Sequence, residues 1–137
     1  RLKHVASGRE LLVANTHFDN SMPSQVKMAA LCQERFRSLG MGDLPMIWMG
    51  DFNTDQNRGD YPMLVSDGWK DSYTASPLAS PGGRDDNAPT FPGNPGKRID
   101  HIFYRGPFTP THWEVVSYAD PKRHLSDHFP VFAKLKW

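Results

Sequence analysis

The sequence has little cysteine, no long apolar run and no dominant charge, and each of these absences excludes a class of protein. Cys32 is the one cysteine in 137 residues, so no internal disulfide can form and we expect no cysteine-based zinc site. No apolar stretch approaches the ~20 residues of a membrane-spanning helix, so we expect no transmembrane segment. The formal net charge of +1 is too balanced to indicate nucleic-acid binding by itself.

What the composition does contain is typical of one globular domain. Hydrophobic residues make up 38% and charged residues 23% of the chain, which argues against long disorder. A length of 137 residues predicts a single domain over 1–137. The chain begins with Arg1 rather than methionine and shows no signal peptide, so the compartment stays open.

The first half of the chain shows the order of strands and helices that is typical of an α/β protein. Apolar alternation predicts a strand over 10–16, helix-forming residues fill 25–39, and Gly40 stands where a glycine often ends a helix. Residues 46–49 read as a second strand. The order strand, helix, strand predicts a parallel pair joined by a right-handed crossover.

Two features indicate how these elements pack. Residues 46–49 contain few polar positions, so we expect both faces of this strand to be covered. One face of the helix gathers four apolar residues: Val26, Ala29, Ala30 and Phe36.

Shorter elements follow in the second half. We expect a short helix around 61–65 and strands over 98–104, 113–118 and 129–135. The segment 76–97 is dense in Pro, Gly, Ser, Asp and Asn and reads as a long surface loop. Loops of this length are often functional, so we consider it a candidate for substrate selection.

Polar side chains stand where several of these strands end or begin. They are Asn15 and His17, Asp51 and Asn53, Asp100, and Asp127 with His128. In α/β sheets, ligand sites form where several strands terminate at one edge. Residues two apart on an extended chain share a face, so Asp51 and Asn53 should project together while Phe52 enters the core.

Asp100 interrupts an otherwise apolar strand, and a carboxylate there needs a polar partner. We expect this partner to be His128. An aspartate that accepts from one ring nitrogen fixes the tautomer and leaves the other nitrogen free as a base. Its negative charge should also raise the pKa of the histidine.

Four motifs in this order resemble those of the endonuclease/exonuclease/phosphatase superfamily, the DNase I-like metal-dependent phosphoesterases. The motifs are THF at 16–18, GDFN at 50–53, RIDHIF at 98–103 and SDHFPV at 126–131. The resemblance extends from about Leu11 to the C-terminus. It implies a DNase I-like α/β sandwich, which in the full family has four layers, with two sheets between helical layers.

The resemblance also implies the roles of the site residues. His17 would contact the scissile phosphate and assist the leaving group, Asp51 would orient or deprotonate water, and Asn53 would hold a phosphate oxygen. His128 would be the general base, oriented by Asp100. The implied reaction is in-line attack of water on a phosphodiester or phosphomonoester.

A divalent cation belongs to the same implied reaction. Asp127 would be a metal-site carboxylate, with Asp51 and Asn53 as further oxygen ligands. Hard oxygen ligands suit Mg²⁺ or Mn²⁺ better than zinc. The partner implied is a phosphate ester substrate, with nucleic acid as one candidate.

One large part of the family pattern is missing. The family opens with a strand ending in asparagine and then a strand with a metal-binding glutamate, whereas Glu10, Glu34 and Glu114 occur in no matching context. We therefore expect a partial or unusually short domain that lacks the N-terminal half. Three explanations fit: a fragment of a longer enzyme, a short form that assembles as a homo-oligomer, or a relative that binds phosphate without hydrolysing it. The alternative function is accordingly a non-catalytic phosphate- or partner-binding module or an inactive half-domain.

Overall fold

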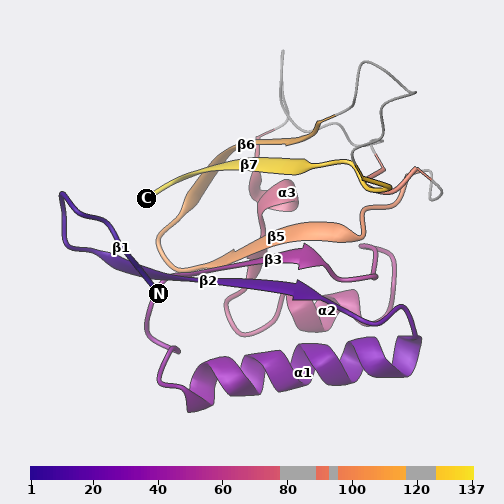
Figure 1. The fold of residues 1–137 in the computed structure, drawn as a ribbon, viewed down its shortest axis with the longest axis horizontal. Helices are drawn as coiled ribbons and strands as arrows, with labels where there is room; N and C mark the ends of the chain where they lie inside the picture. Colours follow the sequence, from indigo (N-terminus) through magenta and orange to yellow (C-terminus); the bar gives the residue numbers. More distant parts are fainter. Residues whose placement is uncertain (78–88, 93–95, 117–125) are drawn as a thin grey trace.

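The computed structural model describes residues 1–77, 89–92, 96–116 and 126–137. Ten elements follow one another along the chain (Figure 1). They are β1 (Leu2–Lys3), β2 (Glu10–His17), α1 (Met22–Ser38), β3 (Met46–Asp51), α2 (Tyr61–Leu64), β4 (Lys70–Asp71), α3 (Ser72–Ala75), β5 (Asp100–Arg105), β6 (Thr109–Val115) and β7 (Val131–Lys136). Among the described residues, no helix has the length and apolar character that crossing a bilayer requires.

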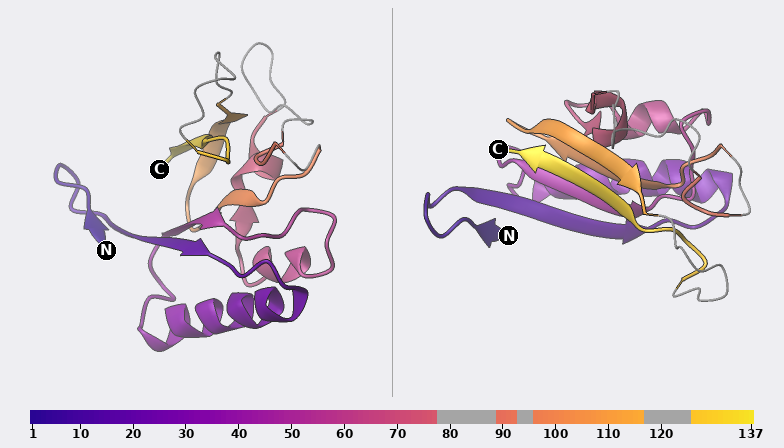
Figure 2. Two further views of the ribbon diagram at one scale, coloured as in Figure 1. Left: turned by 45° about the vertical axis from the view of Figure 1, so that its right-hand side comes forward. Right: turned by 90° about the horizontal axis from the view of Figure 1, so that it is seen from above.

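The strands form two sheets. The larger has the order β1-β2-β3-β5-β4, and the smaller pairs β6 with β7. β2 and β3 are parallel and α1 connects them, which confirms the predicted strand–helix–strand unit. β5 then pairs with β3 in the antiparallel direction. α1 and α2 lie on one side of the larger sheet, and β6–β7 lies on the other side (Figures 1 and 2).

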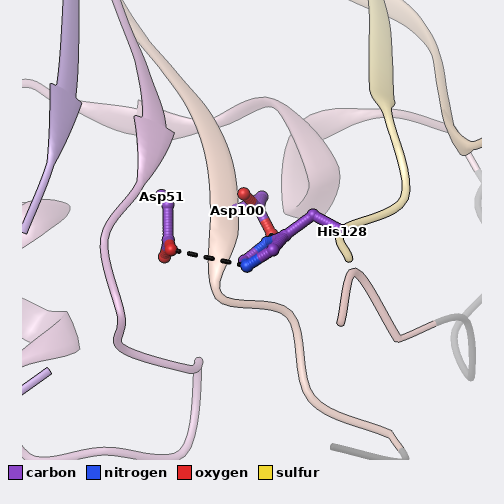
Figure 3. Close-up of side chains that lie close together, drawn as sticks. All are labelled: Asp51, Asp100 and His128. Carbon is purple, nitrogen blue, oxygen red and sulfur yellow. Dashed lines mark hydrogen bonds and ion pairs between the residues drawn. The ribbon is translucent and has the colours of Figure 1, made fainter. Parts of the chain in front are cut away.

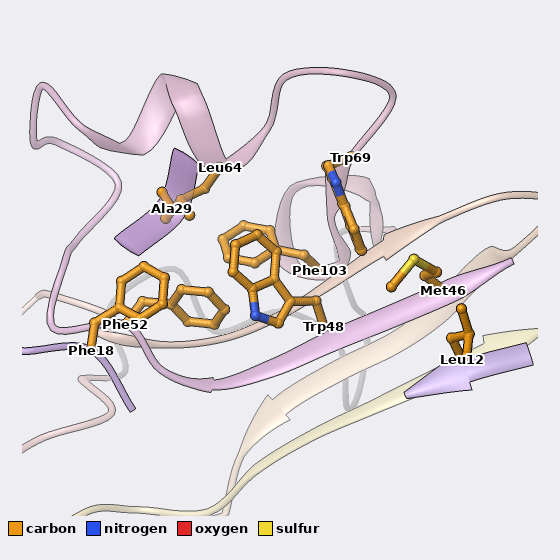
Figure 4. Packing of buried hydrophobic residues seen from close by; sticks show 9 residues of the cluster. All are labelled: Leu12, Phe18, Ala29, Met46, Trp48, Phe52, Leu64, Trp69 and Phe103. Carbon is orange, nitrogen blue, oxygen red and sulfur yellow. The ribbon is translucent and has the colours of Figure 1, made fainter. Parts of the chain in front are cut away.

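The core fills the space between α1 and the sheet (Figure 4). Trp48 of β3 lies at its centre, with ring centroids 5.3 Å from Phe36, 5.0 Å from Phe52 and 5.4 Å from Trp69. These pairs have the edge-to-face geometry that aromatic quadrupoles favour. Phe52 is fully buried, as predicted, and it anchors the turn that follows β3.

The helix prediction was right in extent but partly wrong in its packing face. α1 begins three residues before the predicted start, and Gly40 follows it with a φ of 67°, the left-handed conformation that suits glycine. Ala30 is exposed; the buried positions are Gln25, Ala29 and Gln33. The buried residues are four positions apart, as residues on one face of a helix are, but two of them are glutamines whose side-chain amides donate to backbone carbonyls across the core.

The expectation that both faces of β3 are covered is wrong for the outer face. Met46 and Trp48 are buried against the helices, while Ile47 and Met49 on the opposite face are only half-buried. Val13 of β2 is paired in register with Ile47 and is 37% exposed. Among the described elements, β7 packs against β5, and neither β6 nor β7 makes comparable contact with β2 or β3.

Other predictions differ in their bounds. The strand expected at 113–118 is β6, which begins at Thr109 because it pairs with β7 along its whole length. β1, β4 and α3 were not predicted; of the elements with two to four residues the sequence indicated only α2, because elements this short have too few positions to show a period. Most of the loop expected at 76–97 lies outside the described residues.

Candidate active site

Three of the candidate residues lie in one row across the sheet. The register pairs His17 of β2 with Asp51 of β3, and Asp51 with Asp100 of β5. β2 and β3 are parallel and end together, while β5 runs the other way and begins at this edge. Side chains paired across neighbouring strands point to the same face, so the three polar groups meet on the outer face of the sheet.

His128 reaches this row from the segment before β7, and its ring faces Asp51 (Figure 3). The expected contact with Asp100 is present. The distance from His128 Nδ1 to Asp100 Oδ2 is 2.8 Å. A carboxylate oxygen is an acceptor, so Nδ1 carries the proton and donates it. Nε2 is left to face Asp51, whose Oδ2 lies 3.7 Å away.

These contacts shift two pKa values. Partial burial acts to lower the pKa of His128, but the hydrogen bond with Asp100 and the charges of Asp100, Asp51 and Asp127 outweigh it, so the pKa is raised as the sequence predicted. Burial raises the pKa of Asp51, against the hydrogen bond from the backbone amide of Asn53, and the charge of Asp100 raises it further. The carboxylates of Asp51 and Asp100 thus repel each other in the cleft, and a bound cation would reduce this repulsion.

The turn after β3 differs from the expected extended chain. β3 ends at Asp51, and Asn53 has a φ of 50°, which is left-handed. The turn is closed by the Asn53 amide, which donates to Asp51 Oδ1 at 2.8 Å. The side-chain amide of Asn53 donates to the carbonyl of Phe18 at 2.7 Å and ties the ends of β2 and β3 together. A turn, rather than strand alternation, thus brings Asp51 and Asn53 to one place.

The six residues to which the resemblance gives roles all line one cleft of about 840 Å³. Asn15, the seventh polar candidate, lies outside it on the wall of a neighbouring hollow. The carboxylates of Asp51 and Asp100 form its centre with His128, their ligand atoms within 4.8 Å of one another. The exposed His17 places Nε2 3.4 Å from Asp51 Oδ2. Asp127 is exposed at the wall and lies outside the central group.

The donors of this cleft fit a hard divalent cation. The direct contact between Asp100 and His128 occupies the facing atoms of those two groups. The cleft wall also carries the oxygen donors of Asp51, Asn53 and Asp127, and those of Asp19 and Asn20 beside them. Carboxylate and amide oxygens are the ligands of Mg²⁺ and Mn²⁺.

Sequence reasoning missed the residues that support this cleft from beneath. The buried Gln25 donates to the carbonyl of Asn53 at 2.7 Å, and Arg58 reaches the same carbonyl at 3.4 Å. An apolar pattern could not identify Gln25 because the residue is polar. Its spacing of four from Ala29 was the available signal.

A buried polar network was missed as well. His101 Nε2 lies 2.9 Å from the carbonyl of Thr54, and Nδ1 lies 3.4 Å from Asp71 Oδ2. Tyr61 donates to the same Asp71 oxygen at 2.7 Å. Burial acts to raise the pKa of Asp71, but the hydrogen bonds and charge of its partners outweigh it and lower the pKa. The available signal was the alternation of residues 98–104, which puts His101 on one face with the apolar Ile99 and Phe103, where a polar ring needs partners.

Comparisons with known proteins agree with this fold. Residues 3–128 match the sequence model of the Endonuclease/Exonuclease/phosphatase family. No curated protein gives a significant match. Among solved structures, a Bacteroides thetaiotaomicron protein of that family has 33% identity and a TM-score of 0.76, over 97% of this chain and 53% of its own.

Two further structures are similar. The Bacteroides thetaiotaomicron mannosyl-6-phosphatase has 34% identity and a TM-score of 0.77, over 98% of this chain and 54% of its own. An endonuclease/exonuclease/phosphatase from Bacteroides vulgatus has 26% identity and a TM-score of 0.80, over 98% and 52%. The chain thus spans about half the length of the solved relatives it matches.

Proposed function

The chain belongs to the endonuclease/exonuclease/phosphatase family and has its DNase I-like α/β fold, and from this we propose that it hydrolyses phosphate esters by in-line attack of water. The observation that carries the proposal is the contact of 2.8 Å between Asp100 and His128, with the free Nε2 of His128 turned to Asp51. An oriented imidazole facing a carboxylate-lined cleft is the arrangement that general-base catalysis needs.

His128 is the base in this mechanism. Its Nε2 takes a proton from a water that Asp51 holds in line with phosphorus. Asp100 accepts the Nδ1 proton in a hydrogen bond and balances the positive charge that the ring gains. General-base catalysis of this kind contributes about 10²–10⁴-fold in rate.

Two other residues bind the phosphate. Asn53 projects from the closed turn after β3 and donates to a non-bridging oxygen. His17 lies at the exposed end of β2 and contacts the phosphate on the leaving-group side, where it can donate a proton to the departing oxygen. Both residues line the same cleft as His128.

Asp51, Asn53 and Asp127 would hold Mg²⁺ or Mn²⁺. When bound, the cation would neutralise charge on the phosphate and on the leaving oxygen. Burial raises the pKa of Asp51 and the nearby charge of Asp100 raises it further, and the closeness of these two carboxylates supports a cation at this place.

The substrate is proposed only as a phosphate ester with an organic group. The similar mannosyl-6-phosphatase is named for a phosphomonoester. A second hollow of about 470 Å³ adjoins the cleft at Asn20, Asn53 and His128, and it gives room for an organic group. Phe91 and Lys97 lie on its wall.

The first experiment measures hydrolysis of bis-p-nitrophenyl phosphate and p-nitrophenyl phosphate with Mg²⁺, with Mn²⁺ and with EDTA. We expect metal-dependent turnover that His128→Ala lowers by about 10²–10⁴-fold. His112→Ala is the matched control, because His112 is also partly buried and also faces a carboxylate, that of Glu114, outside the cleft. Folded protein that binds phosphate but shows no turnover under any condition would support a binding module instead.

A further inference from the structure

The two partners of the Asp100–His128 pair belong to different sheets. Asp100 is the first residue of β5 in the five-stranded sheet, and His128 lies three residues before β7 in the two-stranded sheet. In the described part of the chain the two sheets share no ladder of backbone hydrogen bonds. The separation of Asp100 and His128 must therefore be fixed by contacts of another kind.

Thr90 makes such contacts on both sides. Its side chain is fully buried, and Oγ1 accepts hydrogen bonds from the backbone amides of Asp100 at 3.1 Å and Ile99 at 2.9 Å. Its backbone carbonyl accepts from the amide of Phe129, the residue after His128, at 2.8 Å. One residue thus binds the start of β5 and the approach to β7.

The neighbouring residue contacts the imidazole itself. The ring centroids of Phe91 and His128 lie 5.0 Å apart, with their planes at 50°. Because the backbone of Thr90 is held, the position of Phe91 is held as well, and its ring limits rotation of His128. Thr90 and Phe91 therefore restrain the backbone beside His128 and its ring, respectively.

We propose that Thr90 is a positioning residue: it sets the separation of Asp100 and His128 by binding the backbone beside each of them. This inference rests on the proposed function, since the dyad it positions is the proposed general base with its orienting carboxylate. Thr90 does not touch the phosphate; it acts through His128. Misplacing a catalytic group by about 1 Å can cost on the order of 10²-fold in rate.

The test replaces Thr90 by residues that differ in one property. Thr90→Val keeps the branched shape but removes the oxygen that accepts from Asp100 and Ile99. We expect kcat to fall by about 10- to 100-fold with KM nearly unchanged. Thr90→Ser keeps the oxygen and should restore kcat to near the wild-type value.

A double variant separates positioning from a general structural effect. If Thr90 acts through His128, Thr90→Val should cause no further loss in a His128→Ala background, because residues that act as a unit are not additive. Loss by the same factor in both backgrounds would overturn the proposal. So would an unchanged kcat in Thr90→Val.

Thr54→Val is the matched control. Thr54 is also buried, at 1% exposed, and its hydroxyl finds no hydrogen-bond partner among the residues that the structure describes. The same substitution there should leave kcat near the wild-type value. A loss equal to that of Thr90→Val would mean that any buried threonine has this effect, which would also overturn the proposal.

A spectroscopic measurement tests Thr90 without turnover. The His128 Nδ1 proton that bonds Asp100 should give a protected NMR signal in the metal-free protein. We expect Thr90→Val to broaden or remove this signal and Thr90→Ser to retain it. A signal unchanged in Thr90→Val would overturn the inference, whereas absence of turnover in the wild type would overturn only the proposed function.

Discussion

At the scale of single residues, the ring of His128 lies between two carboxylates that contact it differently. Asp100 bonds Nδ1 of His128 directly, while Asp51 faces Nε2 from 3.7 Å. Both charges favour the imidazolium, so the pKa of His128 is raised although its partial burial opposes this. The free base is then present only above the raised pKa.

The rate should therefore rise with pH through a midpoint above the ordinary histidine pKa of about 6.5. In Asp100→Asn the main cause of the raised pKa is gone, so the midpoint should fall while the maximal rate drops. NMR titration of His128 in the metal-free protein measures the pKa directly. Asp43→Asn, at an exposed position away from the cleft, is the control.

The same shift has a consequence for stability. A pKa that is raised by folding stabilises the folded state fully below the unfolded pKa, and the stabilisation disappears as pH rises through the folded value. Urea denaturation should thus show a larger loss for Asp100→Asn at about pH 5 than at about pH 9. An equal loss at both pH values would contradict the assigned cause.

At the scale of elements, the site depends on how closely β2 and β3 approach at their ends. Gly50 has a φ of 137°, and a Cβ built there would lie 1.9 Å from the backbone oxygen of Thr16. Only glycine avoids that overlap. The close approach also sets the positions of the next pair in register, His17 and Asp51.

Gly50→Ala should therefore destabilise the protein by about 3 kcal/mol or more, because the overlap is with backbone that cannot move without disrupting the sheet. Gly59→Ala is the matched control: a Cβ there meets no atom within 4 Å, and the effect should stay within about 0.5 kcal/mol. Urea denaturation measures both. Equal stabilities of the two variants would contradict the geometry described for Gly50.

At the scale of the whole molecule, the outer face of β2 and β3 is apolar and open. Val13 is exposed, and Ile47 and Met49 are half-buried beside it. In the part of the chain that the structure describes, β7 packs against the neighbouring β5 and makes no comparable contact with β2 or β3. Burying exposed apolar surface of a sheet favours association. In a purified sample of this chain, the available partner is a second copy of the chain.

We expect the 137-residue chain to self-associate through this face. Light scattering coupled to size-exclusion chromatography should give an average mass that rises above the monomer with concentration. Val13→Glu should return the mass toward the monomer because it places a charge on the contact. Val5→Glu, at a position 97% exposed between β1 and β2, should not. A monomer at every concentration would rule out this assembly.

The sequence by itself determined the local features. Local sequence patterns predicted where β2, α1, β3 and β5 lie along the chain, because the tendency to form a helix or a strand belongs to each stretch of chain itself. An aspartate in an apolar strand indicated a polar partner, and the contact of Asp100 with His128 is present. The assignment of catalytic and metal roles stays a prediction.

The tertiary structure alone decided the features that depend on register and on distant contacts. The row of His17, Asp51 and Asp100 exists because three strands align at those positions. The left-handed turn at Asn53 is held from the distant Gln25. Thr90 lies in a segment without periodicity, so no local pattern indicated its hydrogen bonds with the backbone amides of Asp100 and Phe129. Such contacts join residues far apart in the chain, and no pattern within one stretch can encode them.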